Sequence, residues 1–462
     1  MRVYILFVVI AVLSVYAYRD WFRSLCGALA LMAVIEHPDM PKAIMGIPGL
    51  NPWNILLINV VIAWLLKRRT ENLSWDLPRY LNVLLLMYLA VVVVGVLRAA
   101  MDMGQMHDYT VVDLLSEELI NTVKWVIPGL LLFDGCRSRG RLILATVSVL
   151  AVYFLLAAQV VRWMPPSAAL SGSTLEARSR KIVQNEVGYS RVNMSMMLSG
   201  ASWAVLATLP LVRRRSHKAA IVAAALLIAY GQALTGGRMG YVTWMAVGAI
   251  LCSLRWRRML LLVPAVVVGI ALVLPGTVER MLQGFDETNA MGQEYTDDAE
   301  VTAGRTVIWP LVIDKIGEAP LLGYGRLAMV RTGLRAFLYT QYGEPFPHPH
   351  NAYLEWLLDN GFVGFACVMP VYVLLVVLAG RLFLQNGNPW YNAIGGISLA
   401  LVLALLIASI GSQTFYPREG SVGIWAAIGL MLRLWVQRCR CTRALGRITS
   451  ISVMRPAVLV RS

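Results

Sequence analysis

The apolar run YLNVLLLMYLAVVVVGVL, from Tyr80 to Leu97, decides the fold of this chain. Its 18 residues include no charged side chain, and an α-helix needs about 20 apolar residues to cross a bilayer. The run lacks the strict alternation of polar and apolar residues that marks a transmembrane β-strand. It therefore predicts a membrane-spanning helix.

Apolar runs of this kind recur along most of the sequence. The others are Val3–Tyr18, Leu25–Ile35, Trp53–Leu66, Thr122–Phe133, Leu142–Val161, Met194–Val212, Ala219–Leu234, Tyr241–Leu254, Met259–Leu274, Phe362–Leu382, Ile394–Ile410 and Gly423–Trp435. Several are short, so their helices must extend into the flanking sequence. We expect an all-α polytopic membrane protein with about twelve transmembrane helices.

The composition supports the same class of protein. Mean hydropathy is +0.64; 58% of residues are hydrophobic and 15% are charged, against about 25% charged in a soluble domain. The first apolar run ends without a small-residue cleavage site, so we expect it to be retained. No cysteine falls in the long polar segment described below, so we expect no disulfide framework there.

The net charge of +15 is concentrated in short segments between the apolar runs. These are Lys67–Arg69, Arg137–Arg141, Arg213–Lys218, Arg255–Arg258 and the tail from Arg433 onward. The positive-inside rule places them in the cytoplasm, and charge divided among short loops argues against a nucleic-acid partner. The opposite side then receives four connections, at 98–121, 163–193, 235–238 and 275–350. The side on which the N-terminus lies stays open.

The connection at 275–350 is a polar segment of unusual length for such a protein. It predicts amphipathic helices over Val301–Gly317 and Leu327–Tyr342, followed by a third over Asn351–Asn360 that Gly361 ends. We expect these helices, too small for a core of their own, to cover the outer surface of the membrane domain. The predicted division is 1–274 and 362–437 for the membrane helices, 275–361 for the loop domain and 438–462 for a basic cytoplasmic tail.

A histidine closes this segment. His350 follows three prolines that stiffen the backbone and precedes the helix start at Asn351. Imidazole titrates near neutral pH and can take a proton from a hydroxyl. His348 competes with His350 for this role, and either histidine can instead be a cap or loop residue.

Three arginines on the outer side break the charge rule. They are Arg191, Arg238 after Gly236-Gly237, and Arg305 after Gly304. Guanidinium groups bind phosphate in a bidentate way, and glycines let a large anion approach the backbone. We therefore predict a diphosphate site beside a base, with Asn351, Arg331 and Arg335 as secondary candidates. The alternatives are a membrane-edge anchor for Arg238 and a surface ion pair with Asp297 or Asp298 for Arg305.

The acidic stretch Glu294–Glu300 is the one place that suggests a metal. It lacks a histidine and regular ligand spacing. We expect no metal site and no cofactor.

At this point the motifs resemble a known family. His350-Asn-x-x-Leu354 with Gly361 downstream is similar to the signature of the bacterial O-antigen ligase and O-antigen polymerase superfamily. Further matching motifs are Gly237-Arg238, Gly304-Arg305 followed by Trp309, Pro320 and Gly323-Tyr-Gly325. The resemblance covers roughly the C-terminal half. One departure is Gly237, where relatives often have serine.

The resemblance implies a GT-C-like membrane glycosyltransferase, most like the O-antigen ligase. Such an enzyme takes a glycan from undecaprenyl diphosphate on the periplasmic face of the inner membrane and delivers it to lipid A–core oligosaccharide. By analogy His350 is the family histidine, Arg238 and Arg305 are its arginines, and Arg191 is carried over on a less distinctive motif.

Three other functions remain open. An O-antigen polymerase and a protein O-oligosaccharyltransferase share the same motifs. A lipid-linked glycan transporter is disfavoured, because intramembrane charges mark transporters and these spans are nearly free of charge.

Overall fold

The computed structural model describes residues 2–44, 49–104, 106, 109–282, 304–343, 346–411 and 413–453, with side chains as far as residue 441. These residues form helices and turns and contain no β-strand. The prediction of an all-α multi-pass membrane protein is confirmed. The acidic stretch Glu294–Glu300 lies outside the described residues.

Six helices are long and apolar enough to span a membrane. They are α4 (Arg79–Met101), α8 (Arg139–Trp163), α10 (Arg191–Leu206, extended by η4 at Leu209–Leu211), α19 (Ala352–Phe383), α20 (Pro389–Ala408) and α21 (Val422–Val453). The run Tyr80–Leu97 that opened the sequence analysis lies within α4.

The predicted number of about twelve spans is not confirmed. Four apolar helices have only 10–17 residues: α1 (Arg2–Ala17), α2 (Trp21–Ile35), α3 (Pro52–Lys67) and α12 (Arg238–Leu254). The 3-10 helix η5 (Arg257–Leu262) continues into α13 (Val263–Val273), and α14 (Pro275–Leu282) follows at an angle of 102°. Together they make a seventh span only if the two bent parts are counted as one. Apolar runs of similar length in the sequence therefore correspond to elements of different length and direction.

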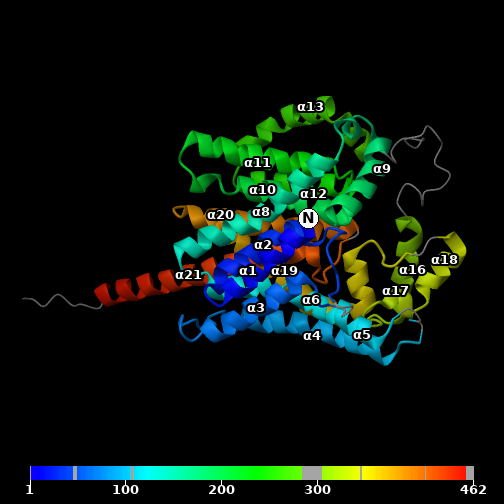
Figure 1. Ribbon diagram of the computed structural model, residues 1–462, viewed down its shortest axis with the longest axis horizontal. Coiled ribbons are helices and arrows are strands. Elements are labelled where there is room, and N and C mark those ends of the chain that lie inside the picture. Colours follow the sequence, from blue (N-terminus) through cyan, green and yellow to red (C-terminus); the bar gives the residue numbers. More distant parts are fainter. Residues whose placement is uncertain are drawn as a thin grey trace, which may run out of the picture.

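The bundle packs around α10 and α20, which contact each other and, between them, α11 (Arg215–Ala233), α12, α19 and α21. Close approach depends on small residues. A Cβ on Gly200 of α10 would lie 2.8 Å from the Cβ of Ala404 on α20, and small residues at such crossings are typical of membrane helices. In Figure 1, α5 (Val111–Leu114), α9 (Gly172–Ile182) and α16–α18 gather at one end of the molecule, while α21 projects from the other.

The helices of the long polar segment differ in two ways from the prediction. The helix expected over Leu327–Tyr342 is two helices, α17 (Ala328–Arg331) and α18 (Leu334–Tyr342), because Gly333 between them has φ 73°. Together with α16 (Arg305–Glu318), they also have a small apolar core that we did not expect. It contains Ile308, Val312, Ile316, Ala328, Met329, Leu334, Leu338 and Leu358. Leu358 belongs to α19, so this core, which is separate from that of the bundle, packs the three helices against α19.

Gly361 interrupts α19, as predicted, but the chain continues as helix beyond it. Gly361 has φ 62° and ψ −171°, which breaks the hydrogen-bond ladder. The turn at 320–325 satisfies the freed groups: Phe362 N–H donates to Pro320 O (2.8 Å) and Tyr324 N–H donates to Leu358 O (2.9 Å). A Cβ on Gly323 would lie 2.5 Å from Leu358 O, so this turn needs glycine there.

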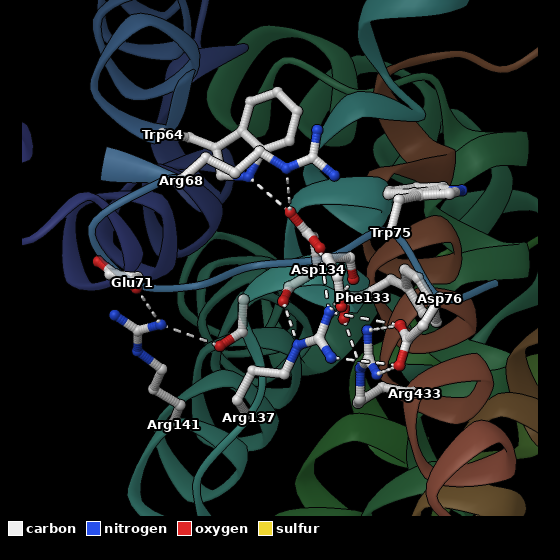
Figure 2. A network of polar contacts seen from close by, with 12 residues as sticks. Trp64, Arg68, Glu71, Trp75, Asp76, Phe133, Asp134, Arg137, Arg141 and Arg433 are labelled. Atoms are coloured by element: carbon white, nitrogen blue, oxygen red, sulfur yellow. Dashed lines mark hydrogen bonds and ion pairs between the residues drawn. The ribbon is translucent and has the colours of Figure 1, made fainter. Parts of the chain in front are cut away.

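A network of ion pairs closes the basic end of the bundle (Figure 2). Asp134, fully buried at the end of α7 (Ile127–Gly135), pairs with Arg68 (3.3 Å) and Arg137 (3.1 Å). Asp76, in the connection before α4, binds the buried Arg433 of α21 through both carboxylate oxygens, at 2.7 and 2.9 Å. Arg68, Arg137 and Arg433 belong to the basic segments that the charge rule places in the cytoplasm. Their ion pairs also connect helices that are far apart in the chain.

Candidate active site

The turn before α12 presents Arg238 at the end of the bundle opposite this network. Gly236 has φ 66°, and Gly237 caps α12 without a side-chain bond, so Arg238 is the first residue of the helix. The turn lies against α10. A Cβ on Gly237 would approach Ser195 Oγ to 2.6 Å, and one on Gly240 would overlap the same atom. The glycines are therefore required by packing as well as by backbone conformation.

Arg305 occupies an equivalent position at the start of α16. Its N-cap is Gly304, with φ 75°. Burial lowers the pKa of Arg305 from its ordinary value, and the positive charge of Arg238 lowers it further. The two arginines are thus close enough to repel one another, and the buried Nε of Arg305 has no hydrogen-bond partner among the described residues. An anion bound between them would relieve this repulsion.

Arg191 begins α10 and faces a carboxylate of α9. Arg191 Nη1 and Glu176 Oε1 are 3.5 Å apart. The same oxygen is 2.5 Å from Nη2 of Arg280 on α14, and Arg280 Nε donates to the carbonyl of Gly236 (3.4 Å). Glu176 therefore neutralises part of the cluster, and Arg280 attaches α14 to the turn that carries Arg238.

Arg280 is the residue that the sequence analysis missed. It is 6% exposed, and the charges of Arg191 and Arg238 both act on it. A signal was present, because Arg280 lies in the outer connection at 275–350, where the charge rule disfavours arginine.

His350 lies beside Arg305 in a strained backbone conformation. Its φ of 53° is in the left-handed region, which costs a non-glycine residue about 1–2 kcal/mol. Its ring meets Phe346 edge-to-face, with centroids 6.1 Å apart. Burial is the main cause that lowers the pKa of His350 to about 4, followed by the charges of His348 and Arg305. The imidazole is therefore neutral at pH 7, as a proton acceptor must be.

His348 contacts His350 directly. The ring centroids are 4.5 Å apart at 81°, and the His350 backbone N–H donates to His348 Nδ1 at 3.3 Å. Burial lowers the pKa of His348 as well.

The secondary candidates are used elsewhere. Asn351 caps α19, its Oδ1 accepting from the backbone N–H of Tyr353 (3.0 Å) and Leu354 (3.3 Å). Arg331 pairs with Asp102 after α4 (2.9 Å), and Arg335 acts on Tyr109 in the same region.

A second arginine that the sequence did not indicate fixes the loop domain to α19. Arg326 is 3% exposed and pairs with Glu118 (2.7 Å), Glu355 (3.0 Å) and Asp359 (2.9 Å). Its guanidinium also lies 3.7 Å from the ring centre of Tyr416. Glu355 and Asp359 lie in the first turns of α19, shortly after His350, so this buried cluster stabilises the start of that helix.

Fold and site together define a multi-pass membrane protein with a cationic site and a neutral histidine at one end of its helix bundle. Residues 222–369 match the family model of the O-antigen ligase. This confirms the resemblance to the O-antigen ligase and polymerase superfamily and indicates a membrane glycosyltransferase of ligase or polymerase type. The matched region contains Arg238, Arg280, Arg305 and His350. A search of curated proteins found no match to the chain.

Proposed function

We propose that this protein is an O-antigen ligase of the bacterial inner membrane, with its active site facing the periplasm. It transfers a glycan from undecaprenyl diphosphate to the lipid A–core oligosaccharide, without a metal ion and with inversion at the anomeric carbon. The observation that carries the proposal is a histidine held neutral beside mutually repelling arginines. A base and a diphosphate site are the two parts that this reaction needs.

The arginines act on the leaving group. Arg238 and Arg305, with Arg191 at the edge of the cluster, bind the diphosphate through charge-assisted hydrogen bonds. As the bond between the anomeric carbon and the diphosphate oxygen breaks, negative charge grows on that oxygen. Fixed guanidinium groups stabilise this charge more in the transition state than in the bound donor, which lowers the barrier.

His350 acts on the acceptor. A sugar hydroxyl attacks the anomeric carbon from the face opposite the diphosphate, which inverts the configuration, and His350 takes the hydroxyl proton. The products are the new glycoside, undecaprenyl diphosphate and an imidazolium that later releases its proton to solvent. An imidazolium would repel the adjacent Arg305, so the site favours return to the neutral base.

Purified protein in detergent with EDTA tests this proposal. The substrates are undecaprenyl-diphosphate glycan and lipid A–core, and the variants are wild type, His350→Ala and the control His217→Ala, which removes an exposed histidine of α11. Glycan on lipid A–core from wild type and from His217→Ala, but not from His350→Ala, is the expected result. Undiminished transfer by His350→Ala would exclude the base assignment. Chain growth on the lipid carrier would identify a polymerase, and glycan on a protein serine would identify the protein-glycosylating relative.

A further inference from the structure

Two side chains hold the backbone at His350 from opposite directions. His348 Nδ1 accepts the N–H of His350 at 3.3 Å, and Trp309 Nε1 donates to the carbonyl of Pro349 at 3.0 Å. The peptide between Pro349 and His350 is therefore fixed on both its N–H and its C=O. It is also the peptide that leads into the left-handed conformation of His350, and a strained backbone persists only where its surroundings hold it.

We propose that His348 is a positioning residue that aims His350 at the acceptor, with Trp309 as its partner in this role. The inference rests on the proposed function, in which His350 is the base. It decides between the two histidines as the base in favour of His350. It also gives His348 and Trp309 a role that the family motif does not describe.

The hydrogen bond disfavours His348 as the base. A neutral imidazole has one nitrogen that accepts and one that carries a proton. Since Nδ1 of His348 accepts the His350 N–H, its proton lies on Nε2. Neither nitrogen then has a free lone pair with which to take a proton from a sugar hydroxyl.

Trp309 connects the base to the arginines. It lies on α16 one turn after Arg305, so one short helix both presents Arg305 and binds the peptide before His350. The distance between the diphosphate site and the base is thereby set by α16. Such positioning matters because a displacement of about 1 Å can cost about 100-fold in rate.

Substitution of His348 by asparagine distinguishes a positioning role from a chemical one. An Asn side chain accepts the N–H two residues further along the chain in an Asx turn, the same spacing as from His348 to His350. His348→Asn therefore keeps the contact without an imidazole, while His348→Ala loses both. Trp309→Phe keeps an aromatic ring at this position and loses the donating N–H with the rest of the five-membered ring.

We expect His348→Ala and Trp309→Phe to lower kcat about tenfold or more, with the KM for the lipid-linked donor within about threefold of wild type. His348→Asn should recover to within about threefold of wild-type kcat. Its pH midpoint should stay below 6.5, because burial is the main cause of the lowered pKa of His350. Each variant is first compared with wild type by thermal unfolding in detergent. If His348→Ala does not fold, the comparison of His348→Asn with Trp309→Phe decides the question.

The outcomes separate this inference from the proposed function. An inactive His350→Ala together with a His348→Asn variant as poor as His348→Ala would overturn the positioning role and make His348 a chemical participant. A fully active His348→Ala would overturn it too. Full activity of His350→Ala would instead refute the proposed function, whatever the His348 variants do.

Discussion

The pH dependence of transfer tests the link between burial and catalysis at His350. The perturbation is a fall in pH from 7 to 5, which would protonate an ordinary histidine with a pKa of 6.5. The site lowers the pKa of His350 to about 4, mainly through burial and then through the charges of His348 and Arg305. At pH 5, about 90% of such a histidine is still neutral, whereas about 3% of an unperturbed one would be.

The expected kcat/KM at pH 5 is therefore within about 20% of its value at pH 7 and falls with a midpoint near pH 4. The measurement is initial-rate transfer across pH 3–8, with product resolved by gel or mass spectrometry. Intrinsic tryptophan fluorescence at each pH verifies that the protein stays folded.

The same pKa has a consequence for stability, and its sign is opposite to that of a paired histidine. A histidine whose pKa is lower in the folded state binds fewer protons there than in the unfolded chain. Its contribution to stability therefore falls as the pH drops from about 6.5 to about 4, by at most about 3 kcal/mol. An activity midpoint near pH 6.5 with intact fluorescence would refute the reasoning, because it would mean that the base is solvated or is another group.

Three further substitutions have defined outcomes. Arg238→Lys should lower kcat/KM for the donor about 10- to 100-fold, measured by initial rates, because an ammonium cannot replace a bidentate guanidinium on a diphosphate. Asp76→Asn should lower the unfolding free energy by about 3–5 kcal/mol, measured by thermal unfolding in detergent, because it leaves the buried Arg433 without its counter-ion. Gly240→Ala should disrupt the turn before α12 and abolish activity, and Ser195→Gly in the same chain should restore part of it, because the new Cβ would overlap Ser195 Oγ.

Each of these substitutions has a matched control. Arg178→Gln removes an exposed arginine of α9 and should leave kcat/KM within about twofold. Asp39→Asn changes an exposed carboxylate and should alter stability by less than about 0.5 kcal/mol. Gly317→Ala lies in α16 where a Cβ meets nothing within 4 Å, and should be silent. A control as damaging as its partner would mean that the assay reports general destabilisation.

The sequence predicted those parts of the fold that depend on local chemistry. Hydropathy alone predicted α4 and the other long spans, and the positive φ values of Gly236, Gly304 and Gly361 explain why glycines mark the turns beside the site. The number of spans was less predictable, because an apolar run does not reveal bending. The run Met259–Leu274 predicted one span, whereas η5 and α13 cover the run and the chain then turns by 102° at its end, into α14.

The residues of the candidate site also differ in how far the local sequence indicates them. Arg238, Arg305 and His350 were predictable because each stands beside a glycine or at a helix start, where sequence and geometry are coupled. Arg280 and Arg326 carry one signal in the sequence, which is an arginine in an outer connection. Their roles do not follow from that signal, since they depend on partners about 30 to 200 residues away: Arg280 pairs with Glu176 and binds Gly236, and Arg326 pairs with Glu118 and Glu355. A buried arginine is stable only when such partners surround it, and their convergence is a property of the folded chain. The roles of these two arginines are therefore set by the folded chain, while the residues proposed to act on the substrate stand in motifs that the sequence shows.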